Sequence, residues 1–205
     1  MWGFLFELSL PPPELDRFLW AYGFVPQRLW SGEYGISASL VSILVAMFLH
    51  AGWMHFGGNM LFLWIFGDNI EDRIGHFRYL VFYLACGVAA SLTHAFFNAS
   101  SRLPSLGASG AISGVLAAYL FLYPRARILT LVPIFLFWTV EVPAFLFIVF
   151  WFVVQFFSGT ASLSTSTPTT GGTAYFAHIG GFVAGIVLLA ALKPPLRRPP
   201  TYSWS

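Results

Sequence analysis

GASGAISGVLAAYLFLY, residues 107–123, is an apolar stretch that opens with a serine between small residues. Gly110 and Gly114 are four residues apart, so they share one face of a helix, where small side chains let a second helix approach closely. The hydroxyl of Ser109 either belongs to this packing or takes part in chemistry, and GASG alone does not separate the two. The apolar run is closed by Pro124, and its length predicts a membrane-spanning helix.

The composition of the whole chain places this stretch in a membrane protein. Hydrophobic residues make up 58% of the 205 residues and charged residues only 9%, and the mean hydropathy is +0.75. Soluble domains carry about 25% charged residues. We therefore predict an all-α polytopic membrane protein with a single domain over residues 1–205. The single cysteine, Cys86, excludes an internal disulfide and a cysteine-based metal site, and no basic tract interleaved with aromatic residues predicts nucleic-acid binding.

The remaining apolar segments predict four more full spans. Each approaches the length that crosses a bilayer, and charged, polar or proline-containing segments separate them. Together with 107–123, the predicted spans are 54–70, 79–97, 142–157 and 174–192. Residues 1–10, MWGFLFELSL, are apolar but too short to cross, so they predict the remnant of a truncated first span.

The stretch 129–157 is too long for one straight crossing. Pro133, Glu141 and Pro143 interrupt its first part. We therefore expect that first part at the membrane interface and a span over 142–157.

The segments outside the spans differ in character. Residues 11–53 combine prolines, charges and aromatic residues, which predicts an interfacial first loop. The core spans then cover 54–192, and residues 193–205 form a cytoplasmic tail. The uncharged, low-complexity run 158–173 predicts a flexible loop.

The lysines and arginines orient the chain. If the C-terminus is cytoplasmic, the basic residues gather on the inner side, as the positive-inside rule requires. The inner residues are then Arg73, Arg78, Arg125, Arg127, Lys193, Arg197 and Arg198, and the outer ones are Arg17, Arg28 and Arg102. This orientation favours a multi-pass protein of a prokaryotic plasma membrane, and an organelle membrane stays open as the alternative.

Three predicted spans enter the membrane from the outer side, and each carries polar residues in its first few positions. These residues are His55 and Asn59 on the first, Ser109 on the second and His178 on the third. At 1.5 Å per residue, His178 lies at a depth of roughly 6–8 Å. Polar groups inside a bilayer are costly and usually functional. Four of them at a similar depth predict one shared site.

Small residues allow the helices of this site to approach each other. Ala177, Gly181 and Gly185 form a row with four-residue spacing directly beside His178. Two helices that pack through such rows can bring an imidazole within hydrogen-bond reach of the Ser109 hydroxyl.

These residue types predict acyl-transfer chemistry. A serine hydroxyl is a weak nucleophile until a base takes its proton, and an imidazole titrates near neutral pH. The developing oxyanion also requires donors, for which the Ser109 N–H and the side chains of His55 and Asn59 are candidates. No acidic residue is placed to orient His178, so we expect a dyad of Ser109 and His178 rather than a triad.

This pattern resembles the rhomboid family of intramembrane serine proteases. The matching motifs are HAGWMHFGGN (50–59), EDRIG (71–75), GASG (107–110) and AHIGGFVAG (177–185), and they occur in family order. The resemblance covers essentially residues 1–192. It implies a rhomboid-like helical bundle that hydrolyses peptide bonds in or near transmembrane segments, with no cofactor and no metal. The implied partners are transmembrane protein substrates and the lipid bilayer.

The resemblance also implies a role for each matching residue. Ser109 is the expected nucleophile and His178 the expected general base. His55 and Asn59 are expected to help form the oxyanion hole.

A second group of matching residues is expected to support the site. Gly107 and Gly110 shape the loop and helix start of the nucleophile. Gly181 and Gly185 pack the last span against the helix of the nucleophile, and His50 is expected to be structural.

The chain departs from the family in three respects. Its first span is truncated, Ser113 stands where many members carry a tyrosine that stacks on the catalytic histidine, and the Trp-Arg pair of some members' first loop is not evident. Either Tyr175 or Phe176 is expected to take the place of that aromatic ring, or no aromatic residue does. The resemblance also assigns the loop 158–173 as a mobile cap and the span 142–157 as the gate for substrate.

Three other functions remain to be weighed against the protease. A zinc site at His50 and His55 is disfavoured because residues five apart do not share a helix face and no H-E-x-x-H motif is present. A non-proteolytic relative that binds membrane clients is expected to lack the serine or the histidine. A transporter or channel is expected to carry polar residues through the full membrane depth.

Overall fold

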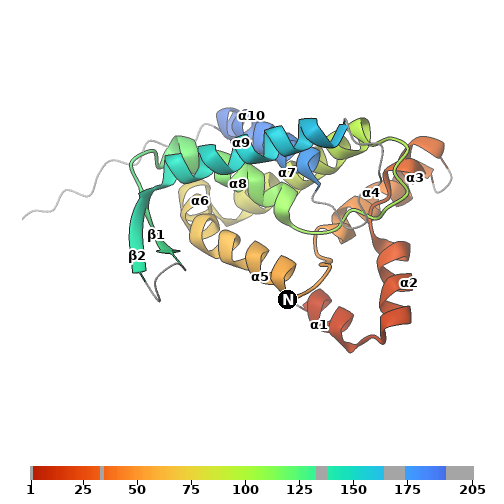
Figure 1. The fold of residues 1–205 in the computed structure, drawn as a ribbon. Helices are drawn as coiled ribbons and strands as arrows, with labels where there is room; N and C mark the ends of the chain where they lie inside the picture. The colour runs from red at the N-terminus through yellow and green to blue at the C-terminus, as the bar shows by residue number, and fades with distance from the viewer. Residues whose placement is uncertain (1, 33–34, 133–137, 164–173, 193–205) are drawn as a thin grey trace, which may run out of the picture.

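Four long apolar segments form the helices at the centre of the molecule (Figure 1). They are α7 (His76–Phe97), α8 (Ser109–Leu122), α9 (Ala144–Leu163) and α10 (Tyr175–Leu192). The structure is a computed structural model, which describes residues 2–32, 35–132, 138–163 and 174–192. α7, α8 and α10 pack against one another, and α9 packs along α10. The chain is therefore a helical bundle, as its hydropathy predicts.

Helix α8 is the central element, because residues 110–119 are all buried. Its glycines bring α10 close. A Cβ atom added to Gly181 would collide with the carbonyl oxygen of Gly110, and one added to Gly185 would collide with the backbone of Gly114. The two small-residue rows thus face each other, and their backbones are in direct contact.

The segment before α7 is a continuous helix in which a π-helical turn separates two α-helical parts. It consists of α5 (Trp53–Phe62), the π-helical turn η1 (Leu63–Gly67) and α6 (Asp68–Ile74). Phe66 and Ile70 are buried against the bundle. Gly75 lies at the junction between α6 and α7. Its φ is 88°, a backbone conformation that favours glycine.

The expected interfacial loop is itself helical. It contains α2 (Pro12–Tyr22), α3 (Pro26–Ser31) and α4 (Gly35–Ala46), and α1 (Trp2–Ser9) precedes it. Proline stands at the first position of both α2 and α3, where its missing N–H costs nothing. α3 and α4 pack on α7, and α1 lies near the start of α5 (Figure 1).

The prediction of an all-α fold is wrong between α8 and α9. β1 (Arg127–Val132) and β2 (Trp138–Pro143) form an antiparallel hairpin, with Leu129 opposite Glu141. The sequences RILTLV and WTVEVP are rich in β-branched residues, which fit a pleated strand better than a helix. Arg127 and Glu141 pair across the strands at 3.0 Å. Pro143 ends β2, so α9 begins at residue 144.

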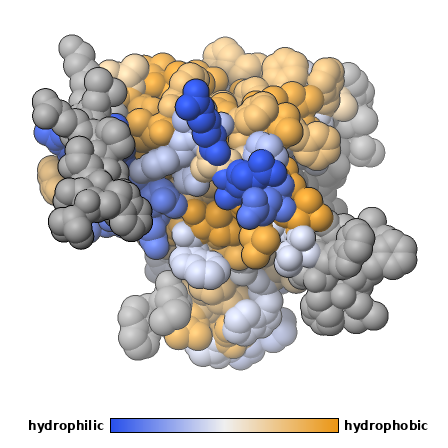
Figure 2. All heavy atoms as spheres, turned by 90° about the vertical axis from the view of Figure 1, so that its left-hand side faces the viewer, coloured by the Kyte–Doolittle hydropathy of each residue, from blue (hydrophilic) through white to orange (hydrophobic). Residues whose placement is uncertain are grey.

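The hairpin lies at the end of the bundle where α6 meets α7 (Figure 1). Seen from this end, hydrophilic side chains gather between hydrophobic ones (Figure 2). The exposed charged residues here include Arg78 and Arg125, which belong to the predicted inner set of basic residues.

Among the described residues, three helices are long and apolar enough to cross a membrane, namely α7, residues 144–161 of α9, and α10. α8 has 14 residues. Such a helix is about 21 Å long, which is less than the ~30 Å hydrocarbon core. The number of five full spans therefore stays a prediction. α9 continues to Leu163, so the expected loop 158–173 begins as helix. Its remainder and the tail 193–205 lie outside the described residues.

Candidate active site

Ser109 is the first residue of α8, and a turn in the preceding loop places it there. Gly107 has a φ of 109°, a conformation that favours glycine. Its N–H donates a hydrogen bond to the carbonyl oxygen of Ala46 at 2.8 Å, which ties the loop to α4. The side chain of Ser113, one turn along α8, donates to the carbonyl oxygen of Ser109 at 2.7 Å. Two hydrogen bonds therefore fix the N-terminus of α8, where the hydroxyl of Ser109 lies.

His178 lies in the first turn of α10 and is only 6% exposed. Its Nε2 atom lies 2.8 Å from Oγ of Ser109. The contact follows from the glycine rows, because Gly110 and Gly181 bring the starts of α8 and α10 together. The structure thus brings the expected nucleophile and the expected base within hydrogen-bond distance.

Sequence reasoning missed two residues of α9 that contact the imidazole. Oε1 of Gln155 lies 2.7 Å from Nδ1 of His178, and the ring centroid of Trp151 lies 5.5 Å from that of His178. The available signal was a single amide in the apolar run AFLFIVFWFVVQFF, residues 144–157. Of the two aromatic residues expected to support the histidine, Phe176 stacks instead on Phe97, at 4.3 Å. Trp151 takes this place because the inner face of α9 points at the start of α10.

His55 and Asn59 lie together on α5, beside the loop of the nucleophile. Nδ1 of His55 accepts a hydrogen bond from the N–H of Ala51 at 3.4 Å. In a neutral imidazole this leaves the proton on Nε2. A Cβ atom added to Gly107 would lie 2.5 Å from Nε2 of His55 and 3.5 Å from Nδ2 of Asn59. Two N–H donors thus converge on the backbone two residues before Ser109.

The side-chain amide of Asn59 is buried, and its nitrogen is not hydrogen-bonded to any described residue. The residue is 6% exposed, and Nδ2 has no hydrogen-bond partner among the described residues. A buried polar group without a partner is costly, and such groups in native structures call for an explanation.

His50 lies just before α5 and is also buried, at 4% exposure. Its backbone N–H donates to both carboxylate oxygens of Glu7, each at 3.2 Å. Its ring meets those of His55 and Phe56 edge to face, at centroid distances of 5.3 and 5.1 Å. Burial, and after it the charge of His55, lowers the pKa of His50 to about 4, so the ring is neutral at neutral pH.

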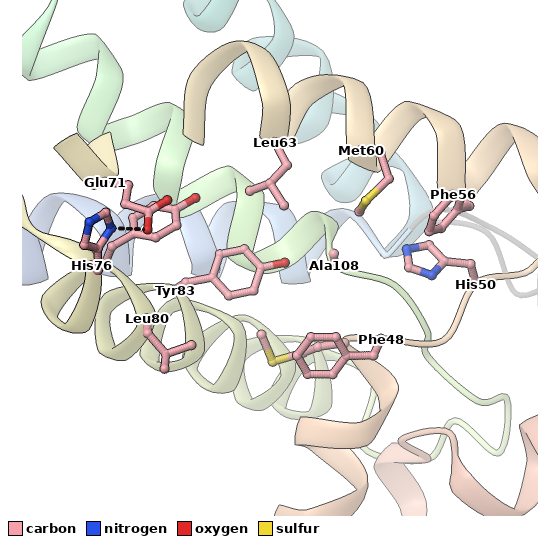
Figure 3. A pocket seen from close by; sticks show the side chains of 12 residues that line it. Phe48, His50, Phe56, Met60, Leu63, Glu71, His76, Leu80, Tyr83 and Ala108 are labelled. Carbon is pink, nitrogen blue, oxygen red and sulfur yellow. Dashed lines mark hydrogen bonds and ion pairs between the residues drawn. The ribbon is translucent and has the colours of Figure 1, made fainter. Parts of the chain in front are cut away.

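Two cavities lie near these residues. The larger, of about 480 Å³, lies between α5 and α7, with His50 and Phe56 at one end and the pair of Glu71 and His76 at the other (Figure 3). The smaller, of about 20 Å³, lies beside Ser109 itself. The larger cavity therefore reaches His50 and the loop residue Ala108, and the smaller one reaches Ser109.

Metal-ligating side chains do not gather in the described part of the chain. No three His, Cys, Asp or Glu residues there are close enough together to hold an ion. His50 and His55 are neighbours, but no third ligand joins them within these residues.

The helical fold and the buried polar site define an integral membrane protein. Residues 37–195 match the family model of the Rhomboid domain. The chain belongs to the rhomboid family.

Three curated relatives illustrate the membership. The chain is 33% identical over 179 residues to Rhomboid protein 1, mitochondrial, of Saccharomyces cerevisiae, covering 85% of this chain and 46% of that protein. It is 32% identical over 125 residues to Presenilin-associated rhomboid-like protein A, mitochondrial, of Danio rerio, covering 60% and 31%. It is 42% identical over 79 residues to Rhomboid protease GluP of Bacillus subtilis, covering 38% and 15%.

These names bear on the extent and the location of the chain. It spans less than half the length of each of the three relatives. Two of them are mitochondrial by name, so the predicted prokaryotic plasma membrane finds no support in them.

Proposed function

We propose that this chain is an intramembrane serine endopeptidase that cleaves peptide bonds in or near the transmembrane segments of other membrane proteins. Ser109 is the nucleophile and His178 is the general base. The observation that carries the proposal is the 2.8 Å contact between Oγ of Ser109 and Nε2 of His178, held by two helices in direct backbone contact. A mere packing serine has no need of an imidazole at this distance and depth.

The reaction begins when His178 takes the proton of the Ser109 hydroxyl and Oγ attacks the carbonyl carbon of the scissile bond. The carbonyl oxygen becomes negatively charged, and the N–H groups of His55, Asn59 and Ser109 are the donors that stabilise it. The Ser109 N–H is at a helix start, where backbone N–H groups lack helical partners. His178 then gives its proton to the leaving nitrogen, which leaves an acyl-enzyme.

Water completes the cycle by the same route. A water molecule gives a proton to His178 and its oxygen attacks the acyl carbon. The bond between that carbon and Oγ of Ser109 then breaks, the carboxyl product leaves, and the proton from His178 restores the Ser109 hydroxyl. No step in this sequence calls on a cofactor.

The substrate class follows from the surroundings of the site. The outer face of α9 is apolar and exposed, with Val149, Phe150, Val153 and Phe157 on it, while its inner face contacts His178. A transmembrane helix of a substrate fits such a face. Because a helix keeps its carbonyl groups hydrogen-bonded, the substrate must unwind locally before attack. The name Rhomboid protease GluP of one relative supports a proteolytic role.

Cleavage of a model transmembrane protein by the purified chain in detergent tests the proposal. The variants are Ser109→Ala and, as a matched control, Ser42→Ala on α4, whose hydroxyl bonds a carbonyl of its own helix. We expect cleavage by the wild type and the control and none above background by Ser109→Ala. Binding of the substrate without Ser109-dependent cleavage would favour a non-proteolytic, client-binding rhomboid protein instead.

A further inference from the structure

Gln155 is a buried amide in a helix that is otherwise apolar around it. It is the only polar residue between Ala144 and Phe157, and it is 9% exposed. It lies on the inner face of α9 together with Ile148 and Gly159, which are also buried. A polar side chain at this depth is costly unless it is hydrogen-bonded. Its recorded partner is Nδ1 of His178, at 2.7 Å.

We propose that Gln155 is a positioning residue that selects the tautomer of His178 in which Nε2 can accept the proton of Ser109. The catalytic consequence rests on the proposed function, but the tautomer itself does not. The site is then a hydrogen-bonded triad of serine, histidine and glutamine on α8, α10 and α9, rather than a dyad.

The chemistry of the imidazole supports this role. A neutral imidazole carries one N–H and one lone pair. If Oε1 of Gln155 accepts from Nδ1–H, the lone pair is on Nε2, where the Ser109 hydroxyl lies at 2.8 Å. If the ring had the other tautomer, Nε2–H would point at the hydroxyl oxygen and no base would face the serine. An acceptor beside Nδ1 therefore decides whether the ring can act as a base.

Other titratable groups also lie near His178. His55 on α5 and His94 on α7 interact with it electrostatically, whereas the hydrogen bond at Nδ1 is made with Oε1 of Gln155. Ser109 and Trp151, which contact it from α8 and α9, carry no charge. The amide oxygen of Gln155 thus orients the ring without adding a fixed negative charge to the site.

Trp151 is a second residue of α9 that supports the His178 ring, and it lies one turn before Gln155. Its ring is tilted by 41° against the imidazole, so one helix contacts the ring by an aromatic face and by a hydrogen bond. Ser113, at the position where many family members have a tyrosine, instead bonds the carbonyl oxygen of Ser109. In this chain α9 therefore provides the support that α8 does not.

The proton balance of the first step is simple. The proton of the Ser109 hydroxyl moves to Nε2 of His178 while Oγ forms its bond to the substrate carbon. The Nδ1 proton stays bound to the ring throughout, and Nδ1–H donates a hydrogen bond to Oε1 of Gln155. This hydrogen bond becomes stronger when the ring is positively charged. Nε2 then passes its proton to the leaving nitrogen, and the ring returns to its first state.

Three variants of the full chain test the kinetic consequence. Gln155→Met keeps the length of the side chain and removes the acceptor. We expect kcat to fall about 10- to 100-fold with little change in KM, because part of the roughly 10²–10⁴-fold contribution of a positioned base is lost. Val81→Met, at an exposed position of α7 outside the site, is the matched control and should behave as the wild type. A Gln155→Met protein with the wild-type kcat and pH profile would overturn the proposal.

Gln155→Glu gives a readout that a merely structural role would not move. A carboxylate accepts from the same Nδ1–H, so activity is retained. Because it also stabilises the protonated ring, the acid limb of the pH–activity profile moves to higher pH. An active Gln155→Glu protein with an unmoved profile would count against the contact.

Nitrogen NMR of ¹⁵N-histidine-labelled wild type tests the tautomer without any activity and without a variant that has to fold. The His178 signals are assigned by their loss in His178→Ala. We expect a protonated Nδ1 and an unprotonated Nε2. The reverse assignment would refute the role of Gln155. If the wild type shows no Ser109-dependent cleavage, the proposed function fails, and the NMR result still decides the tautomer.

Discussion

The two halves of the site differ in how completely their polar groups are paired. In the base half, Ser109, His178 and Gln155 form an unbroken chain of hydrogen bonds, at 2.8 and 2.7 Å. In the donor half, Nδ2 of Asn59 and both ring nitrogens of His50 are buried and have no partner among the described residues. One half is thus satisfied in the resting protein, and the other is not.

This difference fits the two tasks that we propose. A base has to be oriented before the substrate arrives, and three helices hold it. An oxyanion donor is useful only if its interaction becomes stronger in the transition state than in the ground state. A buried, unpaired N–H costs about 1–3 kcal/mol at rest, and the arriving negative charge relieves that cost. Substitutions in the two halves should therefore affect stability and activity in different proportions.

Asn59→Ala gives the largest expected change in the donor half. We expect kcat to fall about 10²–10³-fold, as it does on loss of one oxyanion donor elsewhere. The midpoint of thermal unfolding should stay equal or rise, because an unpaired buried amide is removed. Kinetics on a transmembrane substrate and a thermal melt in the same detergent measure the two effects. A large loss of stability would show that Asn59 is instead structural glue between helices.

Gly181→Ala tests whether close helix contact assembles the base half. The new Cβ would fall on the carbonyl oxygen of Gly110, so α8 and α10 must separate. We expect the free energy of unfolding to fall by about 1–3 kcal/mol. Activity should fall by up to about 10²-fold, because a shift near 1 Å misplaces His178.

The matched control for this change is Gly58→Ala on α5, where a Cβ meets nothing within 4 Å. It should change neither property. Equal effects at both positions would mean that the loss reflects glycine replacement in general rather than the contact of α8 with α10.

Glu7→Leu gives the smallest expected effect on activity. The carboxylate accepts the N–H of His50 from a fully buried position, so its loss leaves that N–H unpaired. We expect the free energy of unfolding to fall by about 1–3 kcal/mol. Activity should fall only a few-fold, because His50 reaches the reaction through its neighbour His55. Glu7→Gln, which keeps an acceptor, should restore most of the stability in the same thermal melt.

The contact between Ser109 and His178 was largely predictable from the sequence. Ser109 and His178 each lie beside a row of small residues. Helices that pack closely through such rows bring the two side chains together. Gln155 was not predictable in the same way. A single amide in an apolar run indicates a buried partner, but nothing in the spacing of α9 says that this partner is on α10.

The rest of the fold was predicted less evenly. The long helices follow from hydropathy, since apolar segments of sufficient length have few alternatives in a membrane. The hairpin was missed because the first part of 129–157 was predicted to lie at the membrane interface, and an interface tolerates strands as well as helices. The contact of Glu7 with His50 was also missed, because the residues are far apart in sequence and the bond uses a backbone N–H that no pattern reveals.

Covalent labelling of the purified chain tests whether His178 activates the hydroxyl of Ser109. The chain is treated with a serine-reactive fluorophosphonate, and mass spectrometry locates the adduct and measures its rate of formation. We predict one adduct, on Ser109, whose formation slows at least about 100-fold in His178→Ala, because the base makes the hydroxyl reactive. His76→Ala, which removes an exposed imidazole, should leave the rate unchanged. An adduct on Ser109 that forms equally fast without His178, or no adduct on Ser109 at all, would contradict the account.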